Sequence, residues 1–139
     1  KLMDEIEKRL YESKETAYKI VNNNFFKSSS YYTDYINMRI NQFDTIKRMR
    51  LHFERFNIPV EQMKVMSDFT LCVSENIREI NDCKELLNDL EILRNEFKKM
   101  ELPKSREEFE SRAQLLQFLN DMEEFLLIKR SFFKNKYNN

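Results

Sequence analysis

The segment that follows Pro103 constrains the fold more than any other part of the sequence. Proline lacks a backbone N–H and disfavours a helical conformation of the residue before it, so Pro103 ends the preceding element. Ser105 stands three residues before Glu108, which is the spacing of a capping box. In this motif the serine hydroxyl accepts the N–H of the third helical residue, and the glutamate accepts the N–H of the cap. The sequence therefore predicts a helix over about 106–134.

This last helix is unusually apolar. At about 100° per residue its apolar side chains cover roughly half of the helix circumference. They are Leu115, Leu116, Phe118, Leu119, Met122, Phe125, Leu126, Phe132 and Phe133. A helix with so broad an apolar surface is contacted by two or more neighbours, so we expect it near the centre of a helical bundle.

Four other segments have apolar residues at helical spacing. They predict helices over about 1–22, 31–56, 59–81 and 83–100. The chain contains no glycine and two prolines, so its loops are few and short, which disfavours a many-turned β fold. We expect an all-α antiparallel bundle of four to five long helices that forms a single domain over residues 1–139.

The boundary between the third and fourth segments has two interpretations. Asp82 and Glu85 have capping-box spacing, which predicts a helix break near Asn81–Cys83. One continuous helix as far as Met100 also fits the apolar pattern.

The charge balance and the reactive residue types exclude several classes of function. The 24 basic and 24 acidic residues give a net charge of zero, whereas nucleic-acid-binding domains are normally strongly basic. Cys72 and Cys83 have no neighbouring histidine or Cys-x-x-Cys spacing, which indicates reduced thiols rather than zinc ligands or a disulfide framework. His52 has no Glu-x-x-His pattern. We expect no nucleic-acid partner, no metal, no cofactor and no catalytic residue, and hence no enzyme.

Two arginines of the second predicted helix fall in its apolar sector. At about 100° per residue, Arg39 and Arg50 share the face of the apolar residues between Ile36 and Phe53. A guanidinium that faces a core needs a partner, and one interpretation is a structural ion pair that fixes helix register. The candidate partners on the last helix are Glu108, Glu110 and Glu123. The other interpretation is a pocket for an organic anion, because arginine binds carboxylates in a bidentate fork.

Three tyrosines cluster at the start of the same helix: Tyr31, Tyr32 and Tyr35. As core residues they would close one end of the bundle. As binding residues they would stack on an aromatic ligand.

Two blocks of the sequence resemble a known family. One block is Leu102-Pro103-x-x-Arg106-x-Glu108-Phe109-Glu110-x-Arg112-Ala113, followed by a Phe/Leu-rich helix with Leu127-Ile128-Lys129. The other combines Tyr31-Tyr32-x-x-Tyr35, Met38-Arg39-x-x-Gln42 and Lys47-Arg48-Met49. From about Tyr11 onward, the chain looks like the C-terminal domain of the bacterial aromatic acid exporter family. These are fusaric-acid-resistance-like membrane proteins of Bacillus and its relatives.

The resemblance implies a non-catalytic domain on the cytoplasmic face of the bacterial plasma membrane, with an assembly, gating or substrate-sensing role. The transmembrane domain of the same polypeptide would be its partner. This sequence has no apolar run near the roughly 18 residues that cross a bilayer, and it begins without methionine, so we expect a fragment of a longer protein. The family name suggests an aromatic carboxylate as ligand. The candidate residues for ligand binding or structural ion pairs are Arg39, Arg50, Arg106, Glu108, Glu110, Arg112, Tyr32 and Tyr35.

The alternative function is a free-standing helical adaptor or scaffold that binds a partner protein. Membrane-spanning segments upstream in the natural polypeptide would favour the exporter, and their absence would favour the adaptor. For the exporter domain we expect a homodimer, because long helices with broad apolar faces often associate.

Overall fold

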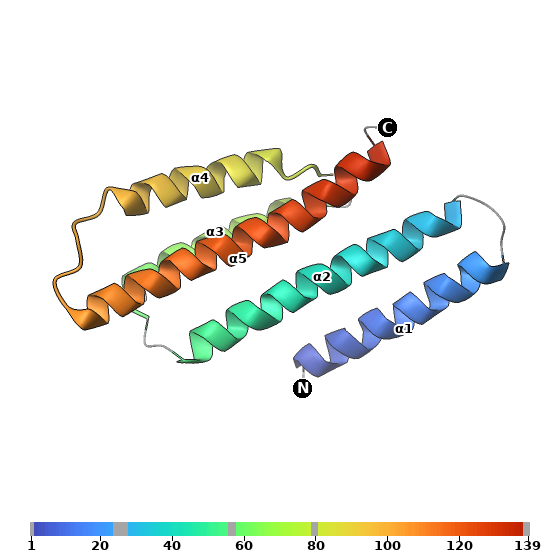
Figure 1. Ribbon diagram of the computed structural model, residues 1–139, viewed down its shortest axis with the longest axis horizontal. Helices are drawn as coiled ribbons and strands as arrows, with labels where there is room; N and C mark the ends of the chain where they lie inside the picture. Colours follow the sequence, from blue (N-terminus) through green and yellow to red (C-terminus); the bar gives the residue numbers. More distant parts are fainter. Residues whose placement is uncertain (1, 24–27, 56–57, 79–80, 138–139) are drawn as a thin grey trace.

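The computed structural model describes residues 2–23, 28–55, 58–78 and 81–137. In these ranges the chain forms helices and no strand (Figure 1). The five helices are α1 (Leu2–Asn23), α2 (Ser28–Arg55), α3 (Val60–Asn76), α4 (Lys84–Lys98) and α5 (Arg106–Tyr137). The prediction of an all-α bundle of four to five long helices is confirmed. Among these helices, none combines the length and the apolar character that a membrane span requires.

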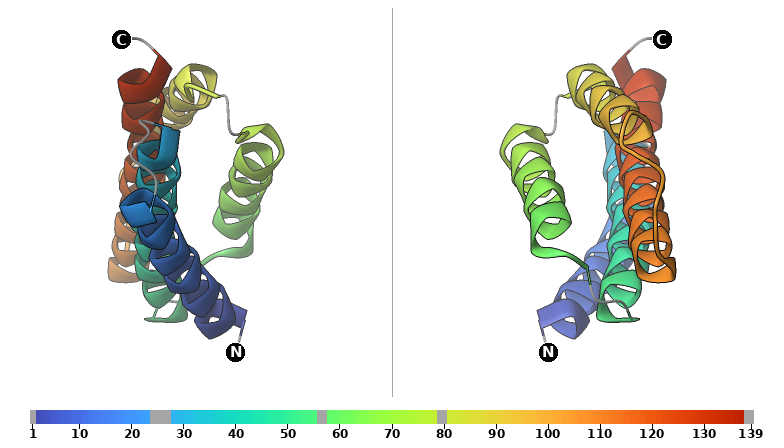
Figure 2. Two further views of the ribbon diagram at one scale, coloured as in Figure 1. Left: turned by 90° about the vertical axis from the view of Figure 1, so that its right-hand side faces the viewer. Right: turned by 90° about the vertical axis from the view of Figure 1, so that its left-hand side faces the viewer.

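Four of the helices form a layer, and the fifth stands on one side of it. Figure 1 shows α1, α2, α5 and α4 side by side in that order, with each neighbouring pair antiparallel. Figure 2 shows α3 on a single face of this layer, in contact with α5. The central helix is therefore α5, which contacts α2, α3 and α4.

The main hydrophobic core surrounds α5, as its broad apolar surface predicts. Its buried residues come from α2, α3, the start of α4 and α5: Met49, Met66, Phe69, Val73, Cys83, Leu86, Leu90, Leu115, Phe118, Leu119, Met122 and Leu126. Helix α1 contributes none of these residues and packs mainly against α2. The chain therefore has a well-packed region around α5 and a more exposed helix at its N-terminal end.

The third helix ends earlier than the predicted break near Asn81. The alternative prediction of one continuous helix as far as Met100 is wrong. Helix α3 ends at Asn76, because Ile77 adopts an extended conformation. Side chains satisfy the backbone groups that the break exposes: the Asn81 amide donates to the Asn76 carbonyl, and its Oδ1 accepts the Cys83 N–H at 2.8 Å. One asparagine thus connects the end of α3 to the start of α4.

The capping box expected at Asp82 and Glu85 is not formed. The N-cap of α4 is Cys83, which has a left-handed conformation with φ of 57°. Asp82 Oδ1 instead accepts the Lys84 N–H at 3.1 Å, two residues along the chain. The left-handed residue shifts the start of the helix by one position and removes the spacing that the motif needs.

One of the two hydrogen bonds predicted for the capping box at Ser105 and Glu108 is confirmed. Ser105 Oγ accepts the Glu108 N–H at 3.1 Å, as the capping box predicts. Glu108 reaches back one residue further than expected and accepts the Lys104 N–H at 2.7 Å. The glutamate therefore belongs to the turn that starts α5.

Two helices are longer than predicted. Helix α2 begins at Ser28 instead of Tyr31, and α5 continues to Tyr137. The Tyr31 and Tyr137 hydroxyls are 2.9 Å apart and form a hydrogen bond, which holds the last turn of α5 against the start of α2. Residues 24–27, where the sequence predicts the turn between the first two helices, lie outside the described residues.

Candidate functional site

A hollow with an apolar lining lies between α2, α3 and α5, and we call it the apolar cleft. Its volume is about 610 Å³. Its lining residues are Ile46, Met49, Arg50, Phe53, Glu54, Thr70, Val73, Ser74, Ile77, Phe118, Met122 and Phe125. Met49, Val73, Phe118 and Met122 of this lining also belong to the main hydrophobic core. The cleft therefore offers carbon-rich surface to a ligand of the size of a small organic acid.

Arg50 and Glu54 are the charged residues of this lining. Arg50 Nε donates to Glu54 Oε1 at 2.8 Å, four residues further along α2. The Arg50 side chain is 57% exposed, so the expectation that it faces the core is wrong. Its long apolar stem lets a residue of the apolar sector place its guanidinium at the solvent edge. This hydrogen bond uses the Nε–H of the guanidinium, so Nη1 and Nη2 remain able to donate to a second carboxylate.

Two hydroxyl groups face the cleft from α3. Thr70 Oγ1 donates to the Met66 carbonyl and Ser74 Oγ donates to the Leu71 carbonyl, both at 2.7 Å. Each hydroxyl thus has its proton engaged within α3 and keeps oxygen lone pairs as acceptors. The site combines an apolar floor, a cation and weak acceptors, which suits an organic acid with an apolar body.

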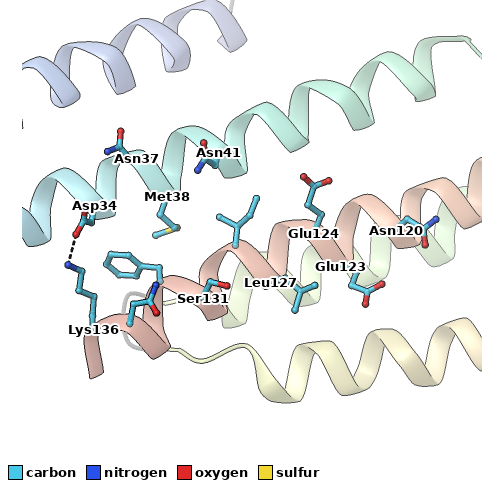
Figure 3. A pocket seen from close by; sticks show the side chains of 13 residues that line it. Asp34, Asn37, Met38, Asn41, Asn120, Glu123, Glu124, Leu127, Ser131 and Lys136 are labelled. Atoms are coloured by element: carbon cyan, nitrogen blue, oxygen red, sulfur yellow. Dashed lines mark hydrogen bonds and ion pairs between the residues drawn. The ribbon is translucent and has the colours of Figure 1, made fainter. Parts of the chain in front are cut away.

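A second hollow, which we call the polar groove, lies between α2 and α5 (Figure 3). Its volume is about 810 Å³. It is lined by Asp34, Asn37, Met38, Asn41, Asn120, Glu123, Glu124, Leu127, Ile128, Ser131, Phe132, Asn135 and Lys136. At about 100° per residue, Asn37 and Asn41 lie about 180° around α2 from Ile46 and Arg50. The cleft and the groove therefore open on opposite sides of α2.

The acidic residues of the polar groove have cationic partners. Asp34 pairs with Lys136, as Figure 3 shows, and Glu124 pairs with Arg48 of α2. Glu123 accepts from Arg94 of α4 at 2.6 Å. Lys136 is the one cation in the lining and is already paired with Asp34, so the groove offers less to an anionic ligand than the cleft does.

Arg39 lies away from both hollows and has neutral partners. It donates to the Tyr35 hydroxyl from Nε at 3.0 Å and from Nη2 at 2.9 Å. Its Nη1 donates to Gln42 Oε1 at 3.0 Å. Gln42 in turn donates from Nε2 to the Phe125 carbonyl at 3.0 Å. Arg39 thus belongs to a polar connection between α2 and α5.

The expected ion pairs between these arginines and the last helix are wrong. Glu108 caps the start of α5, and Glu123 pairs with Arg94. Glu110 accepts from Arg106 Nε at 3.0 Å. The partners of these glutamates come from the turn before α5, from α5 itself and from α4, so a helical wheel of α2 could not identify them.

The remaining candidate residues lie near the start of α5, apart from the cleft. The Arg106 side chain is 90% exposed. Arg112 donates to the Glu101 carbonyl in the preceding turn. The structure therefore does not bring Arg106, Glu108, Glu110 and Arg112 together with Arg39 or Arg50.

The tyrosine cluster closes the end of the bundle between α2 and α5. The Tyr31 and Tyr35 rings each pack against Phe132, with centroid distances of 5.5 and 5.7 Å. Tyr32 is 60% exposed and contacts Tyr31 edge-on at 5.7 Å. These contacts give Tyr31 and Tyr35 a structural role at this end.

Gln42 and Lys129 are two of the buried polar or charged residues whose burial was not predicted. Gln42 is 2% exposed, and Lys129 is fully buried with its Nζ 5.9 Å from the Tyr35 ring centroid. A helical wheel of α5 places Lys129 in the sector of Phe118 and Met122, and this position could have predicted that Lys129 is buried.

Among the described residues, the cysteines and acidic side chains form no cluster of the kind that binds a metal. Burial raises the pKa of the Cys83 thiol, although nearby Lys129 opposes this shift. Cys72 and Cys83 are both free thiols. Within the described ranges, no group of three or more His, Cys, Asp or Glu residues could hold a metal ion.

Comparison with known proteins identifies the family. Residues 1–130 match the family described as "Putative aromatic acid exporter C-terminal domain". The chain is 36% identical over 134 residues to "Uncharacterized protein YqjA" of Bacillus subtilis (strain 168). This alignment covers 96% of the chain and 41% of the relative, so the chain spans about two fifths of that protein's length. No solved structure matches the chain. The resemblance of the two sequence blocks is confirmed: the chain belongs to the family of putative aromatic acid exporter C-terminal domains.

Proposed function

We propose that this chain is the cytoplasmic, non-catalytic C-terminal domain of a plasma-membrane exporter, and that it senses substrate by binding an aromatic carboxylate in the apolar cleft. The observation that carries the proposal is the pairing of an apolar floor with one cation, Arg50, at its edge. Occupancy of the cleft would fix α3 against α2 and α5. Such a change in one helix is a means of controlling the assembly or gating of an attached membrane domain.

The carboxylate would bind the terminal nitrogens of Arg50. Glu54 occupies Nε, so a ligand carboxylate meets a guanidinium that is already oriented. Glu54 also weakens the positive field and competes for the same cation. The polar part of the affinity is therefore small and serves mainly to select anions over neutral molecules.

The aromatic ring would supply most of the binding free energy. Phe118, Phe125 and Met122 lie in the floor and would contact its faces and edges. For a ligand as small as benzoate, the losses of motion on binding leave a Kd of about 0.1–1 mM. This range suits a sensor that responds when an acid accumulates.

Calorimetric titration with benzoate tests the proposal. Arg50→Ala should weaken benzoate binding at least about 5-fold, because the partly exposed cation contributes about 1 kcal/mol. The matched control is Arg106→Ala, which removes an arginine that bonds through Nε to a glutamate four residues further on, outside the cleft. Equal binding by both variants, or no binding by the unaltered chain up to about 20 mM, would refute a carboxylate site at Arg50.

A second candidate function, an adaptor that binds a partner protein or a second copy, is favoured by α1. This helix packs mainly against α2 and leaves Leu2, Tyr11 and Ile20 exposed. Light scattering across a range of protein concentrations measures self-association. A dimer that Leu2→Ser and Ile20→Ser dissociate would support self-association through α1, and a chain that stays monomeric at every concentration would contradict it.

A further inference from the structure

The apolar cleft continues into an adjoining space, which we call the side hollow. The side hollow has a volume of about 420 Å³. It is lined by Phe53, Met63, Met66, Ser67, Thr70, Leu71, Ser74 and Phe118. Four of these residues also line the cleft: Phe53, Thr70, Ser74 and Phe118. The two spaces thus adjoin along these four residues, and we call the two together the elongated site between α2, α3 and α5.

The charged residues of this elongated site line only its cleft part. The lining of the side hollow contains no charged residue, and Arg50 and Glu54 line only the cleft. An amphipathic anion would therefore bind in one direction, with its carboxylate at Arg50 and its apolar body directed to Met63 and Leu71. Both of these side chains are exposed and would lose contact with water when covered.

The length of the site exceeds that of one aromatic ring. Ser74 lines both spaces, whereas Ser67, seven residues earlier on α3, lines only the side hollow. At 1.5 Å per residue, these two positions are about 10 Å apart along the helix axis. Two linked aryl rings have about this length, and a single ring leaves the side hollow empty.

We propose that the site selects carboxylates with an extended apolar body, such as two linked aryl rings, and that the second ring occupies the side hollow. This inference rests on the proposed function, because it uses the same cleft and the same arginine. It adds the size class of the ligand and names Ser67 and Leu71 as specificity-determining residues.

The test compares two acids with the same head group. Benzoate and biphenyl-4-carboxylate are titrated calorimetrically into the full chain. We expect biphenyl-4-carboxylate to bind about 30-fold more tightly, because its second ring removes apolar surface of the side hollow from water. The neutral biphenyl-4-carboxamide should bind about 5-fold more weakly than the acid, because it lacks the charge that pairs with the partly exposed Arg50, whereas general hydrophobic adsorption would not distinguish the two.

Ser67→Phe adds bulk to the side hollow at a residue that does not itself line the cleft. It should reduce the affinity for biphenyl-4-carboxylate at least about 10-fold and leave that for benzoate within about 2-fold. The control is Ser13→Phe, an equal change at an exposed position of α1. Leu71→Ala removes a wall of the hollow without adding bulk, and it should weaken only the two-ring ligand, by about 3-fold.

The outcomes separate this inference from the proposed function. If benzoate binds and biphenyl-4-carboxylate binds no better, the inference is overturned and the single-ring site stands. The inference is also overturned if Ser67→Phe leaves the two-ring ligand unaffected. If neither acid binds, the proposed function fails and the inference fails with it.

Discussion

The apolar cleft and the polar groove are formed by the same two long helices, yet they suit different ligands. On one side of α2, Arg50 stands beside phenylalanine and methionine side chains. On the other side, asparagines and paired carboxylates surround a few aliphatic residues. The difference arises from α3, which stands on one face of the layer (Figure 2) and supplies part of the lining of the cleft. Helices α2 and α5 thus present an apolar surface on one side and a polar surface on the other, and α3 contributes only to the apolar side.

The largest expected difference between the two regions is in stability. Phe118 is buried and lines both the cleft and the side hollow, so Phe118→Ala should lower the free energy of unfolding by about 3–5 kcal/mol. Leu127 lines the polar groove and is exposed, so Leu127→Ala should cost less than about 1 kcal/mol. Urea denaturation followed by circular dichroism measures both. Equal losses would contradict the distinction between a core face and a solvated face.

A smaller difference in stability is expected between substitutions of two adjacent residues of α2, one buried and one in the polar groove. Gln42→Ala removes a buried amide that joins Arg39 to the Phe125 carbonyl, and it should cost about 1–3 kcal/mol. Asn41→Ala, in the lining of the polar groove, should change stability by less than about 0.5 kcal/mol. Urea denaturation followed by circular dichroism measures both changes in the free energy of unfolding. A Gln42→Ala variant as stable as Asn41→Ala would show that the connection between α2 and α5 contributes nothing.

Sequence patterns predict the helices far better than they predict these two regions. The apolar repeat after Pro103 identifies α5 as the central helix, because apolar residues on most sides of a helix require several neighbours. The placement of Arg50 was misjudged because a wheel records the direction of the Cβ atom, whereas the long side chain carries the charge to the solvent edge. The cleft itself depends on how far α3 stands from the layer, and no local pattern encodes that separation.

The polar contacts were predictable where they are local. The cap from Ser105 to Glu108 spans three residues and follows from the sequence spacing. The pair between Arg94 and Glu123 joins α4 to α5 across 29 residues, and the contact between Gln42 and Phe125 spans 83. These pairings follow from the packing of whole helices, so residue spacing carries no signal for them.

A smaller effect concerns Glu54, the residue that competes for Arg50. Glu54→Gln removes a carboxylate from the guanidinium, and it should raise the affinity for benzoate about 3-fold, because an exposed ion pair contributes less than about 1 kcal/mol. Glu110→Gln is the matched control, since Glu110 pairs with Arg106 in the same register away from the cleft. Weaker binding by Glu54→Gln would mean that Glu54 assists the ligand, contrary to the proposed competition.

The smallest effect is expected for an ion pair of the polar groove. Glu124→Gln breaks the pair with Arg48, which is about half exposed on both sides, so the free energy of unfolding should fall by less than about 1 kcal/mol. High salt should reduce the difference further, because mobile ions screen exposed charges. Benzoate affinity, measured by calorimetry, should remain unchanged. A change in that affinity would show that the groove and the cleft are not independent.

The most direct test of the central claim is a methyl NMR titration of the full chain with benzoate, with the methionine methyl groups labelled with ¹³C. Met49 and Met122 line the apolar cleft, whereas Met38 lines the polar groove. We predict saturable shifts of the Met49 and Met122 signals, with the Met38 signal unmoved. Shifts confined to Met38, or no saturable shift at Met49 and Met122, would contradict an organic acid site in the apolar cleft.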